Sequence, residues 1–161
     1  MTEPVLESGG EIDRYIGDEI VVSWLLPDAA SVQPHAANDP RAAAIACIFA
    51  TEDALTARAE RYRTRFGATP RFRAALHAGP LVVGEMGDVK REIVLLGDTM
   101  NTTARIESVC RTNGHDYIAS APAMPDTLPR GVHAANLGPV ELHGKVEVVE
   151  LFALERRNPT S

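Results

Sequence analysis

The chain has 161 residues, of which 45% are hydrophobic and 24% charged, so its length and composition fit one globular domain with its own core. Its formal net charge is -6 without a cluster of Lys and Arg, which argues against nucleic-acid binding. No apolar run approaches the roughly 18 residues of a membrane span, and the N-terminus lacks the basic segment of a signal peptide. The two cysteines, Cys47 and Cys110, lack metal-ligand spacing, so we expect buried thiols in a reducing compartment.

The apolar and turn residues predict an alternation of strands and helices. Strands are predicted where β-branched and apolar residues cluster or alternate with polar ones, and helices where apolar residues recur every three or four positions. The predicted order is a helix end at 4–8, strands 11–16 and 19–26, a surface loop at 27–38, one helix from 39 to 67, strands 71–77 and 81–83, a charged turn at 88–92, a buried strand 93–96, a helix 98–111, a strand 117–119, a turn or short helix 122–129, and strands 132–142 and 146–154.

This order indicates an α+β fold. The strands predict a mixed or mainly antiparallel sheet with one face covered by two principal helices, whereas a doubly wound fold needs a more regular alternation. Asp39 and Asp98 are suited to cap the two helices, because a short carboxylate accepts from exposed N–H groups. Gly67 and Asn113-Gly114 are suited to end them.

The second principal helix carries a pair of residues with chemical potential. Asn101 and Arg105 are four apart, so they lie on one helical face, one turn from each other. A carboxamide one turn before a guanidinium can hold a sugar edge and a phosphate of one nucleotide. The alternative is a surface helix on which an Asn and an Arg have no joint role.

Other polar positions allow a functional and a structural interpretation. Asp18 at a hairpin tip could bind a hard cation such as Mg²⁺ or Mn²⁺, or simply suit the turn. Lys145 in a predicted turn could lie over a triphosphate, or be solvated. The glycines of 79–87 fit neither the Walker nor the dinucleotide pattern and favour close packing between strands or subunits. His77 is expected to be structural.

Four stretches, in this order, resemble the catalytic domain of the class III adenylate and guanylate cyclases. They are Arg14–Glu19, Ala75–Gly87, Leu96–Glu107, and Leu142–Lys145 followed by Val149–Phe152. The resemblance implies a ferredoxin-like cyclase fold over residues 1–155, followed by a polar tail at 156–161. It also implies conversion of a nucleoside triphosphate to its 3′,5′-cyclic monophosphate and pyrophosphate with two Mg²⁺ or Mn²⁺ ions, in cyclic-nucleotide signalling.

The resemblance implies a role for each matching residue. Asp18 matches the second metal-binding Asp, and Asn101 the residue that orients the ribose. Arg105 matches the Arg that stabilises charge on the transition-state phosphate, and Lys145 the Lys that holds the terminal phosphates. Sites of this family form in a head-to-tail homodimer, where one subunit brings the metal carboxylates and the other the Asn and Arg.

Two departures from the family pattern concern the base and the start of the chain. Arg14 and Val94 occupy the base-reading positions, where adenylate-forming members usually have a Lys and an Asp, Thr or Ser. The Arg can still donate to a ring nitrogen, whereas the Val cannot hydrogen-bond. The similarity of Arg to Lys and the frequency of ATP in the family favour ATP over GTP. The family's opening strand, with its first metal-binding Asp, is missing before Thr2, which predicts an inactive or nearly inactive chain. The alternative is a non-catalytic module that dimerises or binds nucleotide and regulates a partner. A cytoplasmic location is expected, with any membrane attachment supplied by upstream segments.

Overall fold

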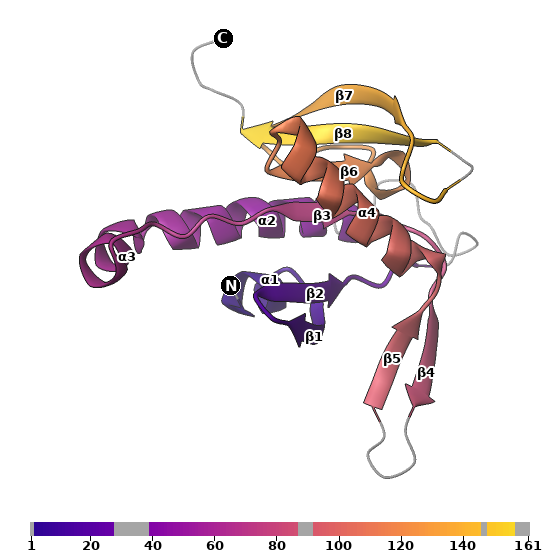
Figure 1. The fold of residues 1–161 in the computed structure, drawn as a ribbon, viewed down its shortest axis with the longest axis horizontal. Coiled ribbons are helices and arrows are strands. Elements are labelled where there is room, and N and C mark those ends of the chain that lie inside the picture. Colours follow the sequence, from indigo (N-terminus) through magenta and orange to yellow (C-terminus); the bar gives the residue numbers. More distant parts are fainter. Residues whose placement is uncertain (1, 28–38, 87–91, 146–147, 157–161) are drawn as a thin grey trace. The chain divides into compact units, whose positions relative to one another are not determined.

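The computed structural model describes residues 2–27, 39–86, 92–145 and 148–156, and the chain divides into two compact units (Figure 1). One unit comprises residues 1–72 with 125–129, and the other residues 73–124 with 130–161. The loop predicted at 28–38, most of the charged turn predicted before Glu92, and the tail after Arg156 lie outside the described residues.

The first unit contains the hairpin and two of the longer helices. Its elements are α1 (Thr2–Glu7), β1 (Glu11–Ile16), β2 (Glu19–Ser23), α2 (Pro40–Thr56) and α3 (Ala59–Phe66). The predicted hairpin is confirmed, and β1 and β2 pair antiparallel on either side of Gly17 and Asp18. Trp24 ties the end of the hairpin to α1, because its indole N–H donates to the Ser8 hydroxyl at 3.2 Å.

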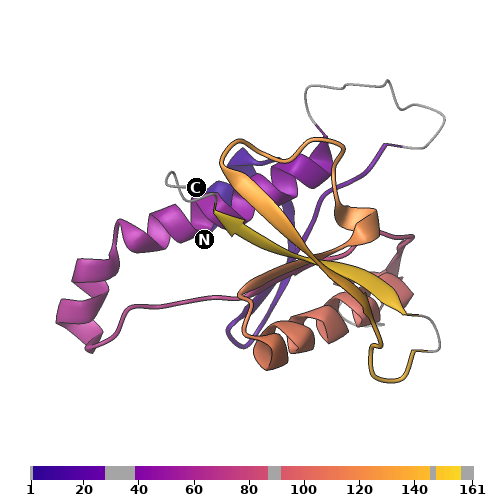
Figure 2. The same cartoon turned by 90° about the horizontal axis from the view of Figure 1, so that it is seen from above.

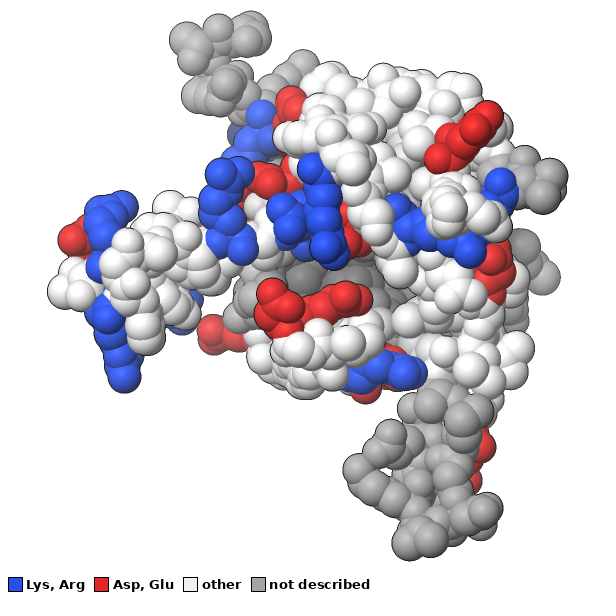
Figure 3. Space-filling model, viewed as in Figure 1, with Lys and Arg blue, Asp and Glu red and all other residues white. Residues whose placement is uncertain are grey.

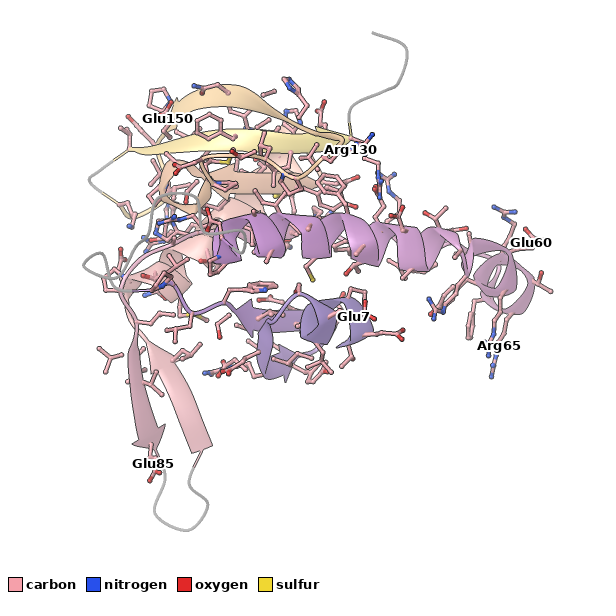
Figure 4. All side chains as sticks on the ribbon, turned by 180° about the vertical axis from the view of Figure 1, so that it is seen from behind. Glu7, Glu60, Arg65, Glu85, Arg130 and Glu150 are labelled. Atoms are coloured by element: carbon pink, nitrogen blue, oxygen red, sulfur yellow. The ribbon has the colours of Figure 1, made fainter. Side chains whose placement is uncertain are left out.

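The single helix predicted from 39 to 67 is wrong, because two helices meet at Ala57 and Arg58. Its start is confirmed: the Asp39 carboxylate accepts from the backbone N–H of Arg41, and Pro40 is the first helical residue. At the break the Arg58 guanidinium donates to the Ala54 carbonyl at 2.9 Å, satisfying an acceptor that the helix end exposes. α3 has no buried residue, and Glu60 and Arg65 project from it (Figure 4). Charged side chains of both signs lie on the surface at this end of the first unit, on the left in Figure 3.

The second unit is built on a four-stranded mixed sheet. Its strand order is β3 (Ala74–Leu76), β6 (Tyr117–Ser120), β8 (Val149–Arg156) and β7 (Val132–Val140). β3 runs parallel to β6, and the other neighbours are antiparallel. The short helix η1 (Ala121–Ala123) follows β6, and α4 (Asp98–Asn113) packs against β3 and β6 (Figure 2). The predicted α+β class is confirmed, and the other principal helix, α2, belongs to the first unit.

The core of the second unit lies between α4 and the sheet. Ile106 and Cys110 of α4 pack with Ile118, Leu142 and Leu151, and all five are at most 3% exposed. The buried positions of α4 recur every three or four residues, which turns one stripe of the helix to the core. The face next to this stripe carries the polar residues of interest.

β4 (Val82–Met86) and β5 (Glu92–Leu96) form a separate antiparallel hairpin, with Glu85 near its far end (Figure 4). The prediction of a strand at 93–96 is confirmed, but its predicted burial is wrong at Leu96, which is 46% exposed. Val82 and Val83 are also about two-thirds exposed, at 66% and 65%. The hairpin is exposed because it does not join the four-stranded sheet.

Candidate functional site

The start of α4 is held against the loop that follows β3. The Thr99 hydroxyl donates to the Pro80 carbonyl at 2.8 Å. A Cβ at Gly79 would lie 2.6 Å from the same hydroxyl oxygen, so the close approach of loop and helix requires glycine there. The close neighbour of Gly79 is thus a helix side chain, not the strand or subunit backbone that the 79–87 glycines were predicted to approach, and no described atom lies within 4 Å of a Cβ at Gly84.

Lys145 is positioned by a tight turn anchored in the core. Its backbone N–H donates to the Leu142 carbonyl at 2.9 Å, and Leu142 is only 3% exposed. Gly144 at the third position has a φ of 71°, which glycine adopts without strain. The turn therefore directs the lysine from a rigid base, and its side chain is only 19% exposed.

The Lys145 ammonium forms an ion pair with Asp98, the first residue of α4. The Nζ–Oδ2 distance is 2.6 Å, and the Thr102 hydroxyl lies 3.3 Å from the same carboxylate oxygen. The hydrogen bond from Lys145 is the main reason that the pKa of Asp98 lies below its usual value, and the Arg105 charge adds to the effect. The predicted capping role of Asp98 is wrong, because Gly97 is the N-cap and the carboxylate is turned to the lysine instead.

Asn101 and Arg105 lie on α4 as the spacing predicts. Asn101 is exposed and Arg105 half-buried, and neither makes a side-chain hydrogen bond within the part of the chain that the structure describes. An Arg105 nitrogen comes within 3.6 Å of the position of a Cβ on Gly144. The guanidinium therefore reaches the turn that carries Lys145, and the two cations lie in one neighbourhood of the second unit.

His77 lies beside this group without joining it. Its Nδ1 is 2.7 Å from the Ser120 hydroxyl, which is fully buried. Burial, together with the positive charge of Lys145, lowers the pKa of His77 below 6.5, so the neutral form is favoured. This agrees with the structural role expected for it.

Val94 lies in β5, where its backbone pairs with Gly84 of β4. Its side chain lies outside the described residues, so the expected contact with a base stays a prediction.

The first unit holds the remaining two predicted site residues. Asp18 is exposed at the tip of the β1–β2 hairpin, with Gly17 at a φ of 61° beside it. Arg14 follows an irregularity in β1, where the register shifts between Ile12 and Arg14. Such a bulge re-aims side chains, and here the Asp13 carboxylate accepts from Arg14 Nε at 2.6 Å.

Arg14 Nη2 is buried and has no hydrogen-bond partner among the described residues. A buried N–H group without a partner is costly, so the guanidinium would gain a hydrogen bond by turning this nitrogen toward an acceptor. Asp13, which holds the other edge of the guanidinium, is 8% exposed on its side chain.

Comparison with known proteins places this geometry in a family. No protein-family model matches the chain. Adenylate cyclase 2 of Rhizobium meliloti is 37% identical over 155 residues, covering 96% of this chain and 40% of that protein. The solved structure of the adenylyl cyclase CyaB from P. aeruginosa has a TM-score of 0.72 at 18% identity, over 98% of this chain and 78% of its own. For the guanylyl cyclase Cya2 the TM-score is 0.71 at 23% identity, over 99% and 76%.

This chain belongs to the class III nucleotidyl cyclase family. The cyclase fold expected from the four sequence stretches is confirmed. The cyclase-family chain spans less than half of the Rhizobium relative, at 40% of its length.

Two findings bear on the metal and the membrane. Among the described residues of this cyclase homologue, no three or more His, Cys, Asp or Glu side chains are grouped as metal ligands would be. No helix of the described chain is both long and apolar enough to cross a membrane.

Sequence reasoning missed two acidic residues of the cyclase-family chain. Asp98 was expected to cap a helix, and Asp13 was not singled out. The signal for Asp98 was weak, because a lysine 47 positions later in the chain gives no local hint of an ion pair. For Asp13 the signal was that it directly precedes Arg14. Successive side chains of a regular strand point to opposite faces, so two neighbours can pair only where a bulge turns both to one side.

Proposed function

We propose that this chain is a nucleotidyl cyclase catalytic domain that converts ATP to 3′,5′-cyclic AMP and pyrophosphate at a head-to-tail homodimer interface. The observation that carries the proposal is the convergence of Arg105 and Lys145 near the start of α4, with Asn101 one turn from Arg105. Two cations and a carboxamide on one rigid helix–turn frame suit a polyphosphate and the sugar attached to it. The similarity to adenylate cyclase 2 supports the same chemistry.

Each side chain has a part in the proposed reaction. The Lys145 ammonium holds the terminal phosphates, and Asn101 orients the ribose. The Arg105 guanidinium stabilises the charge that develops at the α-phosphate as the 3′-oxygen attacks and pyrophosphate leaves. Such groups accelerate the reaction by positioning and electrostatics, because they need no rearrangement at the moment of reaction.

Asp18 is proposed as a ligand to Mg²⁺ or Mn²⁺ in this arrangement. Because Mg²⁺ is often held by one or two carboxylates together with substrate phosphates, a second carboxylate would have to come from elsewhere in the assembled enzyme.

The base preference is proposed from the similarity to adenylate cyclase 2, which makes ATP the favoured substrate and GTP the second. Arg14 is the residue proposed to contact the base. Asp13 holds its Nε, and its Nη2 is buried without a partner among the described residues, so contact with the base requires the guanidinium to turn outward.

The alternative function is a cyclase-like module that binds nucleotide or dimerises without turnover and regulates a partner. It would use the same Arg105, Lys145 and Asn101 to hold the nucleotide. Under that hypothesis the protein retains nucleotide binding and forms no cyclic product.

Turnover of MgATP and MnATP by the protein in its full genomic reading frame, with chromatography of the products, tests the proposal. Arg105→Ala should lower turnover by several orders of magnitude with little change in nucleotide binding. Arg111→Ala, on the same helix but paired with Glu107 at 2.7 Å, is the matched control and should keep normal turnover. Equal rates for the two variants would remove Arg105 from its role.

Mixing two inactive variants tests the dimer. If Asp18 and Arg105 act from different subunits, Asp18→Asn and Arg105→Ala protomers complement each other in half of the dimers, which then hold one intact site. Random mixing should restore about a quarter of the wild-type activity. No recovery after verified subunit exchange would argue against shared sites.

A further inference from the structure

The ion pair between Lys145 and Asp98 is asymmetric. The lysine side chain is 19% exposed and extends from a turn anchored in the core, whereas the Asp98 side chain is 68% exposed. The ammonium is therefore nearly fixed, while the carboxylate can rotate into water. If the 2.6 Å contact breaks, the carboxylate is the partner that moves.

Nothing else among the described residues holds the carboxylate firmly. Thr102 lies 3.3 Å from Asp98 Oδ2, but its hydroxyl also donates at 2.9 Å to the backbone carbonyl of Asp98. The Thr102 hydroxyl therefore keeps an acceptor when the carboxylate leaves. Breaking the ion pair leaves no buried donor unsatisfied except the lysine ammonium, which another anion can accept.

A polyphosphate would meet the same cation. The carboxylate carries one charge, while a triphosphate carries several charges and many acceptor oxygens, and it also faces Arg105 near Gly144. The first turn of α4 favours negative charge in either form. A triphosphate can therefore replace the carboxylate, whereas a singly charged anion gains too little to do so.

We propose that Asp98 is an internal counter-anion: its carboxylate occupies the Lys145 ammonium in the unliganded protein and is displaced when the triphosphate binds. The inference rests on the proposed function, because it assumes that Lys145 holds substrate phosphates. Asp98 is a positioning residue that acts through Lys145. It keeps the lysine in place and makes the site formed by Lys145, Arg105 and Asn101 selective for polyphosphates over singly charged anions.

Calorimetric titration of the 161-residue chain with inorganic triphosphate at low ionic strength tests the proposal. Asp98→Asn should bind triphosphate about two- to fivefold more tightly than wild type, in line with the strength of an exposed ion pair. In a Lys145→Met background the same substitution should have no effect. Glu107→Gln removes a carboxylate from the same helix, where it pairs with Arg111, and should leave the affinity unchanged.

A second measurement follows the carboxylate itself. The pKa of Asp98, followed by NMR of its side-chain carboxyl, should rise when triphosphate is added to the wild type, because the lysine leaves it. Circular dichroism shows that each variant is folded before binding is compared.

The outcomes separate this inference from the proposed function. Weaker, equal or undetectable triphosphate binding by Asp98→Asn overturns the inference, because displacement then has no cost to remove. A gain that persists without Lys145 overturns it too, since the effect would be bulk charge. The Asp98 and Lys145 variants can show the expected triphosphate affinities while no cyclic nucleotide is formed. The counter-anion role of Asp98 is then supported, and the catalytic proposal fails.

Discussion

Gly79→Ala should weaken the docking of α4 on the loop that follows β3. Gly79 has no positive φ, so alanine is compatible with the backbone and the substitution adds only a methyl group. That methyl carbon would lie 2.6 Å from the Thr99 hydroxyl oxygen, where ordinary van der Waals contact begins at 3.4 Å. The clash is therefore with a side chain that is itself held in place.

The size of the destabilisation depends on which group moves to relieve the clash. If Thr99 rotates away, its 2.8 Å hydrogen bond to the Pro80 carbonyl is lost, at a cost of about 1 kcal/mol. If the start of α4 shifts instead, overpacking costs about 1–3 kcal/mol. We therefore expect Gly79→Ala to lower the free energy of unfolding by about 1–3 kcal/mol.

Urea unfolding followed by far-ultraviolet circular dichroism gives this quantity. Gly84→Ala is the control, because no atom of the described residues lies within 4 Å of its Cβ position, and it should change stability by less than about 0.5 kcal/mol. In a Thr99→Ala background the cost of Gly79→Ala should fall below about 0.5 kcal/mol, because the clashing oxygen is gone. An undiminished cost in that background would refute the steric explanation.

Three further predictions concern the second unit. Leu151→Ala should cost about 2–5 kcal/mol by urea unfolding, since Leu151 is fully buried in the core, whereas Leu25→Ala, at a 93% exposed position, should change stability by less than about 0.5 kcal/mol. In the folded protein the pKa of His77 lies below its usual 6.5, so its contribution to stability is complete above pH 6.5 and is lost as the pH falls below that value. His77→Gln should flatten this part of the curve of stability against pH, and an unchanged slope would contradict the prediction. Burial raises the pKa of the Cys110 thiol to about 11, so iodoacetamide at neutral pH should label it only after unfolding, as mass spectrometry would show.

Local chemistry explains which parts of the fold could be predicted from sequence. Asp39 and Pro40 mark a helix start through their own backbone and side-chain preferences, and the structure places the start there. The break at Ala57 and Arg58 could not be predicted, because the apolar spacing continues past it and no Gly or Pro marks it. The exposure of Leu96 was also missed, since an apolar run does not reveal whether its strand joins the main sheet.

The residues of the candidate site also differ in how far the sequence could predict their arrangement. The common face of Asn101 and Arg105 follows from helix geometry alone, so four residues of spacing were enough. The approach of Lys145 to Asp98 and Arg105 depends on the turn after Leu142, which is fixed by packing of the core. Contacts between residues so distant in the chain need the tertiary structure, and only the resemblance to cyclases placed Lys145 with the pair in advance.

The two cations near the start of α4, Lys145 and Arg105, are in different states before any ligand arrives. Lys145 is neutralised by Asp98, whereas Arg105 has no ion pair among the described residues. An arriving polyphosphate must therefore compete with Asp98 for Lys145, whereas no described carboxylate competes for Arg105. If catalysis follows the proposed roles, the arginine acts on the reacting phosphate and the lysine on the terminal ones, so the competition falls on substrate binding rather than on the chemical step. Asp98→Asn should then lower KM in an active preparation and leave kcat nearly unchanged, a separation that a general loss of structure would not produce.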